Sequence, residues 1–277
     1  MRQFAPWRES RHPVGLMTPH FHTQDDLERA LAELLARDPR LTPLLAQTGM
    51  PALRRRAAGF PGLAAVICGQ QLSTKAAAAI WARVTAAFDP FHHDAIRRAR
   101  ADRLGRLGLS AAKIKTLKFI AGELANSRLD LLALSEMPAD DAHKALTALH
   151  GIGPWTADVY LLFCLGHGDA WPAGDLAIQE AIKLAFGLPT RPTVKQMADI
   201  GEAWRPWRGA AAHLFWAYYK VAKAPGFEAV LPPDAATTTK APAKPPRRTT
   251  AATVSRLKRP APASDGGSPP RTAARRR

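Results

Sequence analysis

The chain has 277 residues, 47% of them hydrophobic, which is enough for one large domain or two smaller ones with a buried core. Its two cysteines are too few for a disulfide framework or a four-cysteine metal or iron–sulfur site, and they favour a reducing compartment. Lys and Arg total 39 against 23 Asp and Glu, and the net charge of +16 favours polyanionic partners.

Helical spacing of apolar residues dominates the chain up to about residue 230. Residues 1–13 are polar, so we expect no secretory signal, and no apolar run reaches the roughly 18 residues that a membrane span needs. Alternating strand patterns are absent, and Gly, Pro, Ser and Asp separate the helical segments. The pattern predicts an all-α body with helices at Asp25–Arg37, Thr74–Phe88, Ala111–Ala125, Asp140–His150, Trp155–Leu165, Leu176–Phe186 and Ala210–Ala222.

The end of the chain, residues 231–277, differs from the body in composition. It holds 11 Lys and Arg and 2 Asp, so nine of the sixteen net positive charges belong to it. It is rich in Pro, Ala and Thr and lacks apolar periodicity, which predicts a disordered basic tail. A solvated tail and a nonspecific DNA-tethering arm are both consistent with this pattern.

The segment Leu149–Ala157 joins two predicted helices through Gly151-Ile152-Gly153-Pro154. Two glycines one residue apart allow a tight hairpin, and Pro is favoured in the first turn of the helix that follows. Free backbone N–H groups at such a turn can bind a phosphate. An ordinary helix–helix connection explains the same residues.

Asp175 stands immediately before the apolar helix that begins at Leu176. Asp is a preferred N-cap residue, so capping alone explains it. A capping Asp in a tryptophan-rich cleft could also serve catalysis. The main rival carboxylate is Asp158, whose place inside a helix suits a structural role better.

Together, these segments resemble the helix-hairpin-helix DNA glycosylase superfamily, and most closely its alkylpurine branch. That branch has Leu-x-Gly-Ile-Gly-x-Trp-Thr-Ala and a catalytic Asp twenty residues after the Trp, a spacing that Trp155 and Asp175 keep. The resemblance covers roughly Asp25–Lys223. It extends to Ile67–Ser73, to Leu107–Lys113, and to Trp204–Arg208 with Trp216.

The resemblance implies a glycosylase domain at 1–230 made of two helical subdomains that flank a cleft. The hairpin subdomain would span 59–167, and 1–58 with 168–230 would form the other. Asp175 would be catalytic. The base pocket would hold Trp155, Trp216 and Tyr160, and the DNA contacts would be Gln71, Gly151, Gly153 and Thr156.

Some of these roles have plain structural alternatives. Tyr160 lies about 140° around a helix from Trp155, which argues against a shared pocket. Most of the seven tryptophans could simply be core residues, and Gln71 could cap a helix. The pairs His20/His22 and His92/His93 lack a suitably spaced third ligand, so we expect no metal.

The implied activity is base excision repair of double-stranded DNA that contains damaged bases. The enzyme would hydrolyse the N-glycosidic bond of flipped-out alkylated purines, with 3-methyladenine and 7-methylguanine as examples. Trp155 stands where bifunctional members carry a Schiff-base Lys, which implies a monofunctional enzyme without lyase activity.

The resemblance also implies a monomer in the cytoplasm, near the nucleoid, without membrane partners. Some alkylpurine members have an additional N-terminal β-rich domain, which we do not expect here because the first predicted helix begins at Asp25. No cofactor is required, although the hairpin could hold a structural monovalent cation. Two alternatives stay open: a glycosylase for deaminated or oxidised bases, and a noncatalytic hairpin-based DNA-binding protein.

Overall fold

The computed structural model describes residues 19–224. The predicted basic tail at 231–277 lies outside these residues. The described part contains twelve α-helices and no strand, apart from one isolated bridge between His20 and His167, so the all-α prediction is confirmed. None of its helices is long and apolar enough to cross a bilayer.

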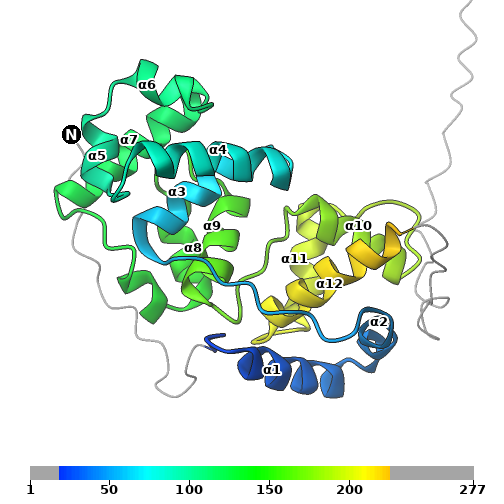
Figure 1. Ribbon diagram of the computed structural model, residues 1–277. Coiled ribbons are helices and arrows are strands. Elements are labelled where there is room, and N and C mark those ends of the chain that lie inside the picture. Colours follow the sequence, from blue (N-terminus) through cyan, green and yellow to red (C-terminus); the bar gives the residue numbers. More distant parts are fainter. Residues whose placement is uncertain (1–18, 225–277) are drawn as a thin grey trace, which may run out of the picture. The chain divides into compact units, whose positions relative to one another are not determined.

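The helices form two groups, which Figure 1 shows side by side. In one group, α12 packs against α1, α2 and α10; in the other, α3, α4 and α7–α9 pack together with α5 and α6 beside α7. The first group comprises α1 (Gln24–Arg37), α2 (Thr42–Thr48), α10 (Leu176–Ala185), α11 (Val194–Glu202) and α12 (Arg208–Ala222). The second comprises α3 (Gly59–Gly69), α4 (Thr74–Ala87), α5 (His93–Arg98), α6 (Ala101–Arg106), α7 (Ala111–Ala125), α8 (Ala139–Thr147) and α9 (Pro154–Tyr160).

Helix α3 occupies a stretch that is not among the helices predicted from the sequence. Its first turn contains Pro61 and two glycines, yet proline is tolerated there because the first turn's N–H groups have no partner within the helix. The segment is buried almost throughout, so tertiary packing outweighs its weak local propensity.

The hairpin between α8 and α9 is tightened by Gly151. Its φ is 80°, and a Cβ at this position would lie 1.9 Å from Oγ1 of the buried Thr116 of α7. Both the left-handed backbone and the close approach therefore require glycine. Gly153 has a φ of −92° and open space around it, and it is the N-cap residue of α9.

A buried arginine connects the two helix groups. Arg208, at the start of α12, is only 6% exposed and donates to Asp169 (Nε–Oδ1 2.7 Å) and to Asp140 of α8 (Nη2–Oδ1 2.9 Å). Arg205 contacts the same two carboxylates. Burial alone would raise the pKa of Asp140, but the hydrogen bonds and charges of Arg208 and Arg205 lower it below its usual value.

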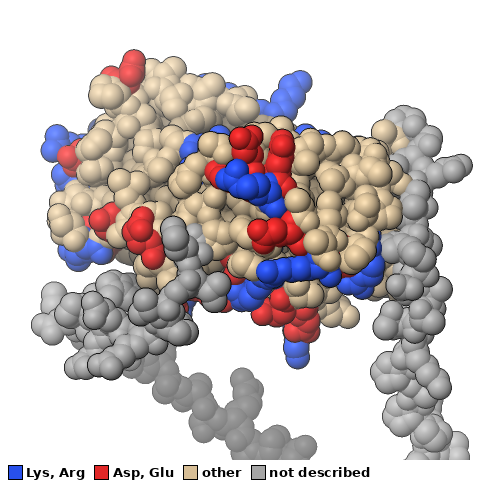
Figure 2. All heavy atoms as spheres, turned by 90° about the horizontal axis from the view of Figure 1, so that it is seen from below, with Lys and Arg blue, Asp and Glu red and all other residues tan. Residues whose placement is uncertain are grey.

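Charged side chains on the face seen from below in Figure 1 are mixed in sign. Figure 2 shows acidic and basic groups side by side there, without a broad basic area. Such a surface does not attract a row of phosphates. It lies on the side of α1, whose first turn carries Asp25 and Asp26.

Replacing Gly151 by Ala should destabilise the fold by about 2–4 kcal/mol, because the new Cβ meets Thr116 and the left-handed backbone becomes strained. Gly153→Ala is the matched control, with an expected cost of at most about 1 kcal/mol. Urea unfolding of the two variants checks this. Equal losses would contradict the close approach to Thr116.

Candidate active site

The carboxylate of Asp175 caps helix α10. Its Oδ1 accepts hydrogen bonds from the backbone N–H groups of Ala177 (3.0 Å) and Ile178 (3.1 Å). The predicted helix cap is therefore confirmed. The N-terminal end of the helix also favours negative charge at this position, since the free N–H groups point at it.

Two tryptophans hold the same carboxylate from other helices. Nε1 of Trp155 in α9 donates to Oδ2 (2.8 Å), and Nε1 of Trp216 in α12 donates to Oδ1 (3.1 Å). Four donors from three helices thus fix its two oxygens, which restricts rotation of the side chain. The sequence placed these three residues in one site, and the structure brings them together through direct hydrogen bonds.

A cleft of about 580 Å³ opens beside Asp175, within the size range of small-molecule sites. One side consists of small and aliphatic residues of α3 and α4, which leaves room for a flat ring. Four aromatic side chains and two arginines also line it. The lining residues are Arg54, Arg56, Ala57, Pro61, Gly62, Ala65, Val66, Gly69, Leu72, Thr74, Ala77, Ala78, Trp81, Trp155, Val159, Phe163, Asp175 and Trp216.

Phe163 is a cleft residue that the sequence analysis missed. Its ring lies 5.1 Å from that of Trp216 and 5.7 Å, edge-on, from that of His213. It belongs to a π-helical turn, Leu161–Leu165, which directly continues α9. Such a turn shifts the helical register, so regular helix periodicity does not predict where Phe163 points.

The ring of His213 packs against the ring of Phe163, which lines the cleft. His213 is 3% exposed, and its Nδ1 donates to the Gly209 carbonyl oxygen (2.8 Å). Burial, together with the charge of Arg54, lowers its pKa to about 4. His213 is therefore neutral at physiological pH and adds no charge to the cleft.

The predicted pocket role of Tyr160 is wrong. Tyr160 is fully buried and does not line the cleft, and its hydroxyl accepts a hydrogen bond from the Gly59 N–H (3.1 Å). Burial raises its pKa. Val159 lines the cleft instead, since it lies one helical turn after Trp155 on the same face, a spacing that the sequence already offered.

The predicted DNA-contact residues fall into two sets. Gly151 and Gly153 are exposed at the hairpin, and Gln71 is exposed at the turn between α3 and α4, with a φ of 56°. Thr156 is 3% exposed, so its side chain is not open to solvent, and the predicted DNA contact of this residue stays a prediction. Its hydroxyl accepts a hydrogen bond from Nε2 of Gln70 (2.9 Å).

Gln70 ties the α3–α4 turn to the hairpin, a role that the sequence analysis did not assign. Besides Thr156, its Nε2 also reaches the Gly151 carbonyl oxygen (3.3 Å). The exposed Gln71 and Leu72 follow directly, and Leu72 borders the cleft. The turn and the hairpin are therefore held in a fixed relation.

The hairpin offers few free oxygens for the monovalent cation that the resemblance allows. The carbonyl oxygens of Leu149 and Gly151 already accept hydrogen bonds, from the Ile152 N–H (3.1 Å) and from Gln70. Each carbonyl keeps a second lone pair, so a cation here stays a prediction.

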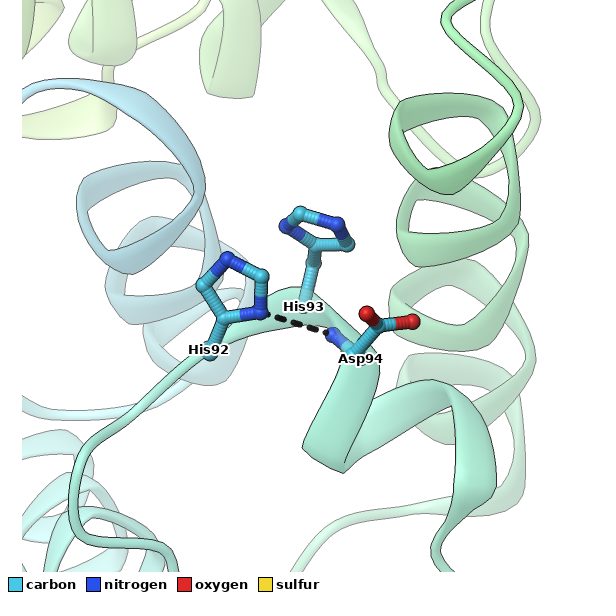
Figure 3. Close-up of side chains that lie close together, drawn as sticks. All are labelled: His92, His93 and Asp94. Carbon is cyan, nitrogen blue, oxygen red and sulfur yellow. Dashed lines mark hydrogen bonds between the residues drawn. The ribbon is translucent and has the colours of Figure 1, made fainter.

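A metal-ligand set of three consecutive residues opens helix α5. Figure 3 shows His92, His93 and Asp94, whose ligand atoms lie within 4.8 Å of one another. Nδ1 of His92 accepts the Asp94 N–H (3.3 Å), and the Asp94 carboxylate pairs with Arg97 (3.1 Å). The existing partners compete with a metal for both residues, and the prediction of no metal stays a prediction.

Residues 64–206 match the family described as HhH-GPD superfamily base excision DNA repair protein. The chain is 30% identical over 230 residues to DNA-3-methyladenine glycosylase 2 of Escherichia coli, covering 73% of this chain and 78% of that protein. It is 30% identical over 197 residues to the probable bifunctional transcriptional activator/DNA repair enzyme AlkA of Mycobacterium tuberculosis, covering 68% of this chain. The chain spans 39% of the length of that relative.

A solved structure with a similar fold is the Schizosaccharomyces pombe 3-methyladenine DNA glycosylase in complex with abasic DNA. It has a TM-score of 0.65 and 27% sequence identity, and the match covers 72% of this chain and 99% of that one.

Proposed function

Because the chain belongs to the HhH-GPD superfamily of base excision DNA repair proteins, we propose that it is a DNA glycosylase that hydrolyses the N-glycosidic bond of alkylated purines in double-stranded DNA. The relatives named above as 3-methyladenine glycosylases support this substrate class. The observation that carries the proposal is the Asp175 carboxylate, fixed by two indoles at the wall of an aromatic cleft. We further propose that the protein acts as a monomer.

The cleft suits a base that has left the DNA stack. Flipping costs a few kcal/mol and is easiest at a weakened pair. The small residues of α3 and α4 leave room for a ring, and Trp155, Trp216, Phe163 and Trp81 offer surfaces for stacking. The exposed Gln71, at the turn next to the cleft, would enter the space that the flipped base leaves in the duplex.

Bond cleavage moves the electron pair of the glycosidic bond onto the base and leaves positive charge on C1′ and the sugar ring oxygen. Asp175 would stabilise this charge from the wall of the cleft. A water molecule then adds to C1′ and gives up a proton, and the Asp175 carboxylate would accept this proton. A purine alkylated at N3 or N7 is already cationic and departs as a neutral base, so it needs no strong general acid.

The residues that line the cleft favour hydrolysis without a following lyase step. A lyase that opens the DNA backbone uses an amine nucleophile. Among the described residues that line the cleft there is no lysine. We therefore propose a monofunctional enzyme that leaves an abasic site in an intact strand.

Asp175→Asn should lower base release from methylated DNA by at least about a hundredfold, because a major electrostatic contribution to the transition state is lost. Binding of duplex DNA should persist, since the hairpin and the α3–α4 turn are untouched. Single-turnover release of 3-methyladenine and a fluorescence binding titration measure the two effects. Unchanged base release would contradict the proposal and favour a noncatalytic DNA-binding protein.

Trp155→Phe and Trp216→Phe each remove one indole donor to Asp175 while keeping an aromatic ring. We expect each to slow base release by about tenfold or more, because the carboxylate loses a fixed orientation. Tyr160→Phe is the matched control: it should cost about 1 kcal/mol of stability and leave the rate within about twofold.

Rapid-quench measurements of base release, with thermal unfolding of each variant, separate the two kinds of effect. If the tryptophan variants released the base at the wild-type rate, the indole hydrogen bonds would have no role in catalysis.

A further inference from the structure

The turn that joins α3 to α4 is exposed, yet its backbone is held at both ends. Residues 71–73 are exposed. Before them, Nζ of Lys113 in α7 donates to the carbonyl oxygen of Cys68 (2.9 Å), which lies in the last turn of α3. After them, α4 begins with a cap, because the Ser73 hydroxyl accepts the Ala76 N–H (3.2 Å). A short exposed segment therefore keeps a defined conformation between the two helices.

Within this turn, Gln71 has a left-handed backbone with a φ of 56°. A residue with a Cβ adopts this conformation only at a cost in free energy, and the conformation persists where surrounding contacts hold it. The Leu72 N–H donates to the Gly69 carbonyl oxygen across the turn (3.2 Å). The contacts of the turn therefore determine how often the Gln71 side chain is held in this position.

The side-chain amide of Gln70 connects the turn to the hairpin. Its two N–H groups have two acceptors there, because Nε2 lies 2.9 Å from Oγ1 of Thr156 and 3.3 Å from the Gly151 carbonyl oxygen. Gly151 is the left-handed glycine of the hairpin, and Thr156 is buried in α9. The residue before Thr156 is Trp155, whose indole donates to Asp175. One amide group thus joins the turn, the hairpin and the helix that holds the carboxylate.

A paired duplex is the substrate for which the position of the turn affects the rate. The flipped state is a minor one there, because the base must leave both its stack and its pair. The rate of release is then the rate of bond cleavage multiplied by the flipped fraction. That fraction rises only while Gln71 occupies the space that the base has left. A base without a pairing partner flips easily, so its release depends little on the turn.

We propose that Gln70 is a positioning residue for base flipping, which fixes the position of Gln71 relative to the hairpin through its hydrogen bonds to Thr156 and Gly151. This inference rests on the proposed glycosylase function and on the insertion of Gln71 proposed above. Gln70 does not line the cleft, so it acts on the flipping equilibrium and not on bond cleavage.

Gln70→Met and Thr156→Val each remove one side of the shorter hydrogen bond with little change in size. Two duplexes of one sequence carry a single 7-methylguanine, opposite cytosine in one and opposite an abasic-site analogue in the other. Release of the base is measured with saturating full-length protein under single-turnover conditions. We expect each variant to slow release from the paired duplex by about tenfold, as for the loss of one to two hydrogen bonds. Release from the unpaired duplex should stay within about twofold.

Three further variants serve as controls. Thr156→Ser keeps the hydroxyl acceptor and should keep the wild-type ratio of the two rates. The double variant Gln70→Met/Thr156→Val should be no slower than Gln70→Met alone, because both changes remove the same contact. Gln24 is a matched glutamine elsewhere, whose amide donates to the Pro51 carbonyl oxygen (3.2 Å) and accepts the Leu53 N–H (2.8 Å). Gln24→Met should leave the ratio unchanged.

A parallel fall of both rates overturns the inference, because it would show that Gln70 only supports the catalytic site. A wild-type rate on the paired duplex also overturns it. Thermal unfolding shows whether each variant is folded at the assay temperature, and either single variant suffices to decide. If wild type releases the base from both duplexes and no variant changes the ratio, the proposed function still stands. Wild-type release from neither duplex contradicts the proposed function itself.

Discussion

The Asp175 carboxylate accepts hydrogen bonds from two backbone N–H groups of its own helix and from the indoles of Trp155 and Trp216. These donors come from α9 of one helix group and from α10 and α12 of the other, so the carboxylate lies between the two groups. Its orientation is set before any DNA binds, which is the condition under which a fixed charge stabilises a transition state without reorganisation. The aromatic and arginine side chains of the cleft line the same cavity as this carboxylate.

Contacts elsewhere in the fold fix the positions of these three helices relative to one another. Gly151 lets the hairpin approach Thr116 of α7, and the hairpin in turn sets the start of α9 and the position of Trp155. Arg208, buried at the start of α12, pairs with Asp140 of α8 and with Asp169. Removing one partner of such a buried pair leaves an uncompensated charge, so this contact resists separation of the two groups. Hydrogen bonds from Gln70 to Gly151 and Thr156 connect the turn that carries Gln71 to the hairpin.

Sequence patterns predicted the parts that depend on local chemistry. Helix α7 begins and ends as expected, and Asp175 is the N-cap that its position before Leu176 indicated. Patterns failed where tertiary packing decides. Helix α3 begins among glycines and a proline that looked like a break. The π-helical turn brings Phe163 to the cleft, where regular helix periodicity does not place it.

A pair of abasic-site analogues tests most directly whether Asp175 stabilises positive charge on the sugar. One duplex carries a cationic pyrrolidine ring in place of the sugar, and the other carries a neutral tetrahydrofuran ring of the same shape. The measurement is the ratio of their dissociation constants, with wild-type protein and with Asp175→Asn. We predict that wild type binds the cationic ring at least about a hundredfold more tightly, as for a transition-state analogue, and that the variant loses this preference. Equal affinity of wild type for the two rings, or the same preference in the variant, would contradict the account.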